Sequence, residues 1–344
     1  MSMQQDDNGV DAVKEAFLNL LCKVNEEEFD EFDTFVRSAL DEYHTKLHNH
    51  DHSDEEMEDE EMQDNAIASV SPASLNRLGK IVTDLRKKVP ISAEAPGEQI
   101  TIPKTEEYEG YTDTNTLHVD GFLFTEDDVD DLCDEGKLSR NFCTDCQSRN
   151  VQPLNFISHS ASVLQLQFLY QVALANKTKG KTILDIGSRL GAVLYTGYLF
   201  TEAKKLIGVE INSWFHSVQA DIVANYKMKD RIELVHADVQ TVPELLMQAD
   251  IIIMNNVFQF FSDVESQKQI WRYIRKETSK KQGLLIVTLP SLQDQLKQAG
   301  LPVKKTLGGW AKQVKLDYSG HWFETELSED DIDEISQVHL YKVI

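Results

Sequence analysis

Apolar and helical patterns alternate along the second half of the chain. From residue 156 onward, short apolar runs that suit buried parallel strands are separated by segments with apolar residues at helical spacing. Strands are expected at residues 182–186, 205–210, 231–237, 249–254 and 283–289, with helices between them at 192–200, 214–226, 242–247 and 264–278. Repeated strand–helix units predict a parallel, doubly wound sheet with right-handed crossovers.

The pattern changes after a further expected helix at residues 292–298. Residues 310–318 and 335–344 both read as strands, and we identify no good helix between them. An antiparallel pair at one edge of the sheet fits this ending. The expected fold class is therefore α/β, a doubly wound seven-stranded sheet with an antiparallel edge pair, preceded by a mainly helical, acidic N-terminal extension.

The chain before this main domain divides into four segments. Residues 1–47 predict a helical hairpin, which either docks a partner or packs as a small lobe. Residues 48–70 form an acidic linker in which eight of the eleven residues 51–61 are Asp or Glu, so we expect disorder. Residues 71–117 hold a helix and a linker, residues 118–155 form a small cysteine-containing subdomain, and the main domain spans 156–344.

The formal net charge of −24 resides in the first 150 residues, because residues 151–344 hold 21 Lys or Arg and 21 Asp or Glu. A neutral domain with an acidic extension is expected to bind nucleic acid poorly, since phosphate contacts need Lys and Arg. The extension either keeps itself solvated or steers a basic protein partner. No apolar run reaches the roughly 20 residues of a membrane span. With a polar, acidic N-terminus, these features predict a cytoplasmic or nuclear protein.

Three cysteines form a candidate structural zinc site. Cys143 and Cys146 have the spacing at which two thiolates chelate one Zn²⁺, and Cys133 is a candidate third ligand. His118 or His159 would have to be the fourth. The alternative is that these are ordinary cysteines near a core.

Polar residues stand at the ends of four successive expected strands. Asp185 and Glu210 end the first two strands, Asp238 follows the third, and Asn255 and Asn256 follow the fourth. In a doubly wound sheet these ends face one crevice, so the side chains are expected to lie close together. Glu210 stands 25 residues after Asp185, near the separation at which an acidic side chain reaches ribose hydroxyls.

A glycine turn follows the first of these strands. Gly187 and Gly191 let the backbone approach a ligand closely, and the helix that opens after them leaves backbone N–H groups free. This arrangement favours a nucleotide-like ligand at the turn. A nicotinamide-dependent oxidoreductase would have the same arrangement of strand, glycine turn and helix. The antiparallel ending and the missing GxGxxG pattern count against this alternative.

At these residues, from about 156 to 344, the chain resembles the class I S-adenosylmethionine (SAM)-dependent methyltransferases. The resemblance implies that Gly187 and Gly191 line the methionine part of the cofactor and that Asp185 accepts from its amino group. Glu210 would bind the ribose hydroxyls. The remaining cofactor residues that it implies are Asp238 at the adenine amino group, Val239 against the ring, and Ser188, Ile211 and Asn255.

One position departs from that family. The family commonly has glycine where this chain has Arg189, so the long side chain must point away from the turn or contact the cofactor carboxylate. The segments DIGSRLG and NNVFQF are most similar to the Dot1-type protein lysine methyltransferases and to uncharacterised methyltransferase-like proteins.

The segment after the fourth strand carries the candidate catalytic residues. Asn255 and Asn256 would hold the methyl acceptor, and Phe258, with Phe260 and Phe261, would form a dry wall near the methyl group; the alternative is a helix start packed on the sheet.

Absences narrow the acceptor. No cysteine follows Cys146, so the main domain has no thiol to attack a pyrimidine ring, as C5-methylation of nucleic acid needs. The segment after the fourth strand lacks the Asn/Asp-Pro-Pro-aromatic motif usual in methyltransferases that act on base amino groups. It also lacks the paired glutamates expected of arginine methyltransferases. The preferred acceptor is a protein nitrogen, lysine or histidine. A small molecule and a catalytically silent binding scaffold are the alternatives.

Overall fold

The computed structural model describes residues 36, 70–103, 108–144, 151–319, 323 and 327–344. The chain forms two compact units, Met1–Asp64 and Asn65–Ile344. The predicted hairpin and acidic linker in the first 69 residues lie outside the described residues, apart from Val36, which is helical. The finer division of residues 71–344 into three segments stays a prediction.

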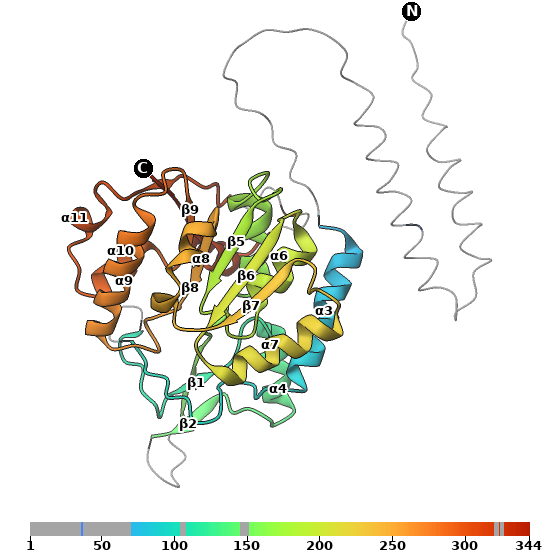
Figure 1. Cartoon of the computed structure of the whole chain (residues 1–344). Helices are drawn as coiled ribbons and strands as arrows, with labels where there is room; N and C mark the ends of the chain where they lie inside the picture. Colours follow the sequence, from blue (N-terminus) through green and yellow to red (C-terminus); the bar gives the residue numbers. More distant parts are fainter. Residues whose placement is uncertain (1–35, 37–69, 104–107, 145–150, 320–322, 324–326) are drawn as a thin grey trace, which may run out of the picture. The chain divides into compact units, whose positions relative to one another are not determined.

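A seven-stranded sheet forms the centre of the second unit (Figure 1). Its spatial order is β10, β11, β9, β8, β5, β6, β7, in which the last five strands run parallel and β11 and β10 add the antiparallel edge pair. The parallel strands are β5 (Thr182–Ile186), β6 (Lys205–Glu210), β7 (Ile232–His236), β8 (Ile251–Asn255) and β9 (Leu285–Leu289). The edge pair is β10 (Ala311–Val314) and β11 (His339–Val343). This arrangement confirms the predicted α/β class, a doubly wound seven-stranded sheet with an antiparallel edge pair.

Helices cover both faces of the sheet because its strands are apolar on both sides. Ile183 of β5 packs in a core with the helices on one face, whereas its neighbour Leu184 packs in a second core on the other face. The helices of the first core are α3 (Pro72–Arg86), α5 (Val163–Phe168), α6 (Ala192–Phe200) and α7 (Ser213–Asn225). The helices of the second are α8 (Pro243–Gln248), α9 (Val264–Thr278) and α10 (Leu292–Gln298).

The prediction that no helix lies between the last two strands was wrong. Helix α12 (Glu329–Ser336) begins at Ser328, whose side chain accepts from the backbone N–H of Asp331. Asp331 accepts in return from the backbone N–H of Ser328, which is a complete capping box. Ile335, assigned to the strand, instead buries its side chain from this helix. Two short elements, the helix α11 (Val303–Leu307) and the turn after β7 at Val239–Thr241, were also missed.

Small elements join α3 to the main sheet. Helix α4 (Glu126–Asp134) begins at a capping box formed by Thr125 and Asp128. The short strands are β1 (Thr116–His118), parallel to β4 (Asn155–Ile157), and β2 (Asn141–Cys143), antiparallel to β3 (Val151–Pro153). After α5, residues Leu169–Ala173 form a π-helical turn. In the described part of the chain, we find no helix whose length and apolarity would let it span a bilayer.

Candidate active site

A cleft of about 430 Å³ opens at the carboxyl ends of the parallel strands. Its lining comes from the ends of β5 and β6, from the residues that follow β5 to β8, from Ser266 and Ile270 of α9, and from Glu98 and Gln99 of the segment after α3. The strand order reverses between β5 and β8, which is where ligands bind in open α/β sheets. The volume lies in the range of small-molecule and cofactor sites.

Of the two predicted glycines of the turn after β5, Gly187 lines this cleft and Gly191 does not. Gly187 and Gly191 have φ angles of 73° and 84°, in the left-handed region that favours glycine. A Cβ at Gly187 would lie 2.2 Å from Cγ2 of Val257, so this glycine is required by packing as well as by conformation. Ser188 points away from the cleft, because its hydroxyl donates to Oε1 of Gln219 on α7 at 3.0 Å.

Glu210 ends β6 with its carboxylate fixed by backbone donors. Oε2 accepts from the N–H of Arg189 at 2.7 Å, and Oε1 accepts from the N–H of Asn212 at 2.8 Å. Burial raises the pKa of Glu210, while these two hydrogen bonds act in the opposite direction. Each carboxylate oxygen keeps a lone pair, so Glu210 can still accept from two hydroxyl groups of a ligand.

Asp185 lies behind the cleft rather than in its lining. Its side chain is buried, and burial together with the charge of Glu210 raises its pKa well above the usual value. The two carboxyl groups are therefore neighbours, as the strand-end pattern predicted. A contact between Asp185 and a cofactor amino group stays a prediction.

The third predicted acid lies at the far end of the cleft. Asp238 caps the turn after β7, where its Oδ1 accepts from the N–H of Gln240 at 2.8 Å. Val239 is buried beside it, and Ile211 exposes 68% of its surface while lining the same cleft. An exposed aliphatic side chain and a buried one at a single opening suit a flat, apolar ring.

The structure separates the predicted acceptor residues from this cleft. Phe258 lines the cleft, but Asn255 and Asn256 line a second hollow of about 180 Å³. Oδ1 of Asn255 is buried without a hydrogen-bond partner, whereas Oδ1 of Asn256 accepts from Nε2 of Gln259 at 2.6 Å. The end of β8 and the residue after it therefore line the second hollow, whereas Val257, Phe258, Phe261 and Ser262 line the cleft.

A carboxylate that the sequence did not single out also lines this second hollow. Glu334 of α12 is partly buried, and burial raises its pKa while a hydrogen bond from Ser162 lowers it. No Lys or Arg occurs among the lining residues. The hollow therefore offers hydrogen-bond acceptors and negative charge, which suit a cationic or N–H-bearing group.

Arg189 does not fill the cleft. Its guanidinium forms an ion pair with Glu98, with Nη1 2.8 Å from Oε1, and Nη2 donates to the carbonyl of Ala93 at 2.8 Å. The guanidinium also lies 4.3 Å from the ring centroid of Phe215 and 4.5 Å from that of Phe261. It therefore forms one wall of the cleft. The linker-like sequence around Glu98 gave no signal for this role.

The two histidines proposed as zinc ligands contact each other instead. Nε2 of His159 lies 2.8 Å from Nδ1 of His118, and the rings stack at a centroid distance of 4.8 Å. His159 also packs edge-on against Phe260 and Phe261, the predicted dry wall. Burial, the largest cause, and the charge of Arg189 lower the pKa of His159 to about 2, so its imidazole is neutral.

The structure gives the zinc prediction no support. Cys133 is a free cysteine, and Cys146 lies outside the described residues. Within the described ranges, no group of three or more His, Cys, Asp or Glu side chains could hold a metal ion. Zinc therefore stays an unsupported prediction.

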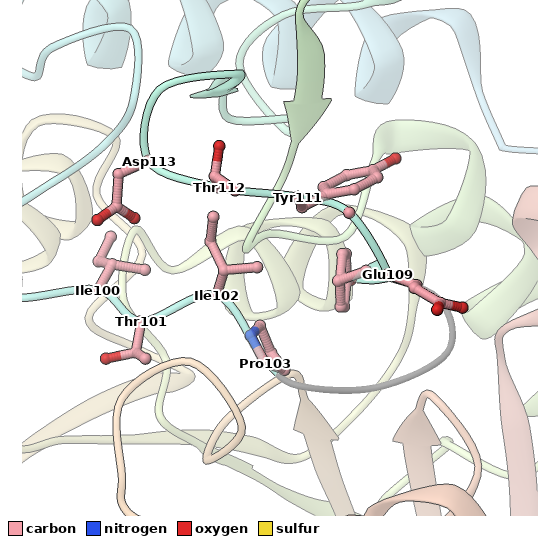
Figure 2. A pocket seen from close by; sticks show the side chains of 10 residues that line it. Ile100, Thr101, Ile102, Pro103, Glu109, Tyr111, Thr112 and Asp113 are labelled. Atoms are coloured by element: carbon pink, nitrogen blue, oxygen red, sulfur yellow. The ribbon is translucent and has the colours of Figure 1, made fainter.

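A third and larger hollow, of about 780 Å³, lies beside Phe260. Figure 2 shows its two walls, Ile100–Pro103 and the segment from Glu109 to Asp113, running alongside each other. The first wall is attached to the site, because the N–H of Thr101 donates to the carbonyl of Phe260 at 3.0 Å. Tyr108 lines both this hollow and the one at Asn255.

Comparison with known proteins gives likeness at the level of structure alone. No protein-family model and no curated protein matches the chain. The O-methyltransferase from Bacillus cereus in complex with SAH is 13% identical over 55% of this chain and 84% of that chain, with a TM-score of 0.33. A protein assigned as an O-methyltransferase from Klebsiella pneumoniae is 16% identical, over 54% and 83%, with a TM-score of 0.35.

A third solved structure is matched over only about half of its own length. A protein assigned as a SAM-dependent methyltransferase from Streptococcus mutans is 19% identical over 56% of this chain and 52% of that chain, with a TM-score of 0.37. Such values assign no role to any residue, so each role proposed below rests on the geometry of this chain.

Proposed function

We propose that the chain is a SAM-dependent methyltransferase. The observation that carries the proposal is the joint placement of Glu210 and Asp238 in one cleft, at the ends of neighbouring parallel strands and beside the glycine turn. A ribose needs a paired acceptor, and Glu210 keeps free lone pairs for it. Asp238 would accept from the adenine amino group, with the ring between Ile211 and Val239.

Bound there, SAM would supply a methyl group on a sulfonium to a nucleophile. The residues of the chain then have to orient that nucleophile, exclude water and accept a proton. Phe258 and Phe261 supply apolar surface in the cleft, and the buried Phe260 closes the space behind them. Asn255, with its unpartnered Oδ1, is the candidate that orients the acceptor by a hydrogen bond from N–H.

The acceptor proposed is a nitrogen, with a protein lysine or histidine preferred. The support is the second hollow, where Oδ1 of Asn255 and the carboxylate of Glu334 offer acceptors with no Lys or Arg opposing them. A carboxylate with a raised pKa is a suitable proton acceptor for an amine that is losing its proton. A small-molecule amine would fit the same chemistry. The larger hollow, whose lining includes Glu109 and Asp113, favours an extended basic peptide.

Isothermal titration with SAM tests the cofactor site. The wild-type chain should bind, and Glu210→Ala should weaken binding at least tenfold, because two ribose hydroxyls lose their acceptor. Glu233→Ala is the matched control: Glu233 lies on neighbouring β7 and is ion-paired with Lys205, and it should change nothing. Absence of binding by the wild-type chain would leave a silent fold that acts as a scaffold.

Transfer of labelled methyl groups in a cell extract tests the acceptor. Asn255→Ala should bind SAM like the wild type yet lose labelling of the substrate. If label passes to small molecules and never to protein, the preference for a protein nitrogen is wrong.

A further inference from the structure

The neutral balance of the main domain conceals two oppositely charged segments. Residues 266–315 hold eleven Lys or Arg and two Asp or Glu, whereas residues 317–334 hold eight Asp or Glu and no Lys or Arg. Counting charges over the whole domain cannot show this separation. The structure shows where a large part of the basic segment gathers.

A hollow of about 570 Å³ lies between the C-terminal half of α9 and the short helix α11. Half of its ten lining residues are basic, and none is acidic: Arg272, Arg275, Lys276, Lys280 and Lys305. The hydroxyl-bearing Ser279 and Thr306 also belong to the lining. We name these residues the basic hollow.

Intramolecular partners do not neutralise this charge. Lys276 forms an ion pair with Glu277 at 3.1 Å, but its own side chain is 74% exposed, so water screens the pair on that side. Arg272, Lys280 and Lys305 make no ion pair with any acidic residue that the structure describes. Nε of Arg275 is buried without a partner, and its Nη2 makes only a long contact of 3.4 Å to the carbonyl of Gly308.

The α9 helix explains only part of the cluster. Basic residues in the last turn stabilise a helix through its dipole, which accounts for Arg275 and Lys276. Lys305 lies in the last turn of another helix, α11, and Lys280 lies two residues beyond the end of α9. Each helix end accounts for its own cations, but neither accounts for their convergence with Arg272 on one hollow.

We propose that the basic hollow binds the phosphate backbone of a nucleic-acid duplex. Phosphate oxygens are contacted by Arg, Lys, Ser and Thr, which are the residue types gathered here. No aromatic side chain lines the hollow, so it offers no stacking platform for single-stranded bases. Apolar residues for insertion into a membrane are also missing from the lining, where Leu301 is buried.

The hollow and the candidate cofactor cleft share one helix, α9, which is labelled in Figure 1. Ser266 and Ile270 of α9 line the cleft, and Arg272 and Lys276 further along the same helix line the hollow. Ile270 of the cleft and Arg272 of the hollow are two residues apart, which is about 3 Å along the helix, but the two linings share no residue. A bound duplex would therefore lie next to the cleft, and the proposal does not depend on methyl transfer.

Fluorescence anisotropy with a labelled 20-base-pair DNA duplex and the full chain tests the proposal. Wild-type protein should bind at 50 mM salt, and the logarithm of its association constant should fall with log salt at a slope of about −3 to −4, as expected for about four phosphate contacts. The triple variant Arg272→Glu, Lys280→Glu, Lys305→Glu should bind at least tenfold more weakly and with a shallower slope.

A second triple variant with the same net charge distinguishes binding at the basic hollow from attraction by the charge of the whole protein. Lys80, Lys204 and Lys229 are exposed lysines outside the hollow, and their simultaneous change to Glu should weaken binding by less than threefold. Equal losses in both triple variants would overturn the proposal, as would failure of the wild type to bind. Equal binding of polyglutamate or of anionic vesicles through the basic hollow would also overturn it. Titration with SAM should be the same for all three proteins, so the proposal and the cofactor site can fail separately.

Discussion

The guanidinium of Arg189 and the carboxylate of Glu98 form a two-point ion pair across 91 residues of sequence. Nη1 lies 2.8 Å from Oε1 and Nη2 lies 3.3 Å from Oε2, and each side chain exposes only 12% of its surface. The pair attaches the segment after α3 to the glycine turn after β5. A position that is glycine in the resembled family therefore holds one wall of the cleft in this chain.

A double-mutant cycle should show strong coupling between these two residues. Arg189→Met keeps an aliphatic stem between Phe215 and Phe261 but leaves Glu98 as a buried, unpaired charge. We expect a loss of about 3 kcal/mol in the free energy of unfolding. Adding Glu98→Gln should recover part of this loss, giving a coupling energy of about 2 kcal/mol in urea denaturation.

The ion pair of Lys179 and Glu202 is the matched control. Its length of 2.8 Å equals that of the Arg189 pair, but its side chains expose 82% and 72% of their surfaces. The same substitutions there should give a coupling energy below about 1 kcal/mol. Similar coupling in both cycles would show that the Arg189 pair is an ordinary surface contact.

Two glycines with the same backbone conformation separate packing from conformational strain. Gly180 has φ +71° and open space where a Cβ would stand, whereas Gly187 has φ +73° and Val257 at 2.2 Å. Gly180→Ala should cost about 1–2 kcal/mol through the left-handed conformation alone. Gly187→Ala should cost about 1–3 kcal/mol more, because the new methyl group overpacks the turn.

The additional loss of stability in Gly187→Ala, compared with Gly180→Ala, should depend on Val257. In the Val257→Ala background, Gly187→Ala should cost no more than Gly180→Ala does in the wild type. An unchanged excess in that background would place the strain elsewhere than at this contact. Denaturant titration of the four variants measures both quantities.

Burial of two neighbouring carboxyl groups should make stability depend on pH. Because the folded-state pKa of Asp185 is raised, the native state holds a proton that the unfolded chain releases above about pH 4. Stability is then full below that value and falls as pH rises toward the folded-state pKa. Asp185→Asn removes this loss, so the variant should become increasingly more stable than wild type between pH 5 and pH 8.

Urea denaturation at four pH values across this window measures the difference. Asp263→Asn is a control of opposite sign, because hydrogen bonds from Ser266 lower the pKa of Asp263. The stability that Asp263 contributes is present above its unfolded-state pKa, so the difference between Asp263→Asn and wild type should be constant from pH 5 to pH 8 and shrink only in acid. A constant difference between wild type and Asp185→Asn from pH 5 to pH 8 would contradict the pKa shift.

The sequence predicted the sheet because each parallel strand is a short, contiguous apolar run, which is the pattern typical of a buried strand. It also placed Glu210 and Asp238 correctly at one cleft, since parallel strands share a carboxyl edge. Asp185 lies at the same edge of the sheet, but its side chain is buried behind the lining of the cleft. The strand pattern fixes which edge a residue occupies, but not whether its side chain reaches the opening.

Contacts between distant segments could not be predicted in this way. Glu98 lies in a stretch without periodicity, and only tertiary structure brings it to Arg189. Glu334 lay in the stretch before the last strand where no helix was predicted, because the capping box at Ser328 was not recognised. The basic hollow was missed because only the net charge of the whole domain was counted. The acidic residues 317–334 largely cancel the charge of the basic residues 266–315 in that sum.

His159 should make the protein sensitive to mild acid. Its imidazole is neutral in the fold, with a pKa lowered to about 2 mainly by burial, whereas an unfolded chain protonates it below about pH 6.5. Stability should therefore be lost as pH falls below that value, by up to about 1.4 kcal/mol per pH unit from this group. Burial also lowers the pKa of His118, which adds to the dependence of stability on pH.

His159→Gln should reduce the slope of unfolding free energy against pH between pH 6.5 and pH 5, while the exposed His236→Gln should keep the wild-type slope. Denaturant titrations at half-unit steps would decide, and a slope unchanged by His159→Gln would mean that the buried ring is not what limits stability in acid.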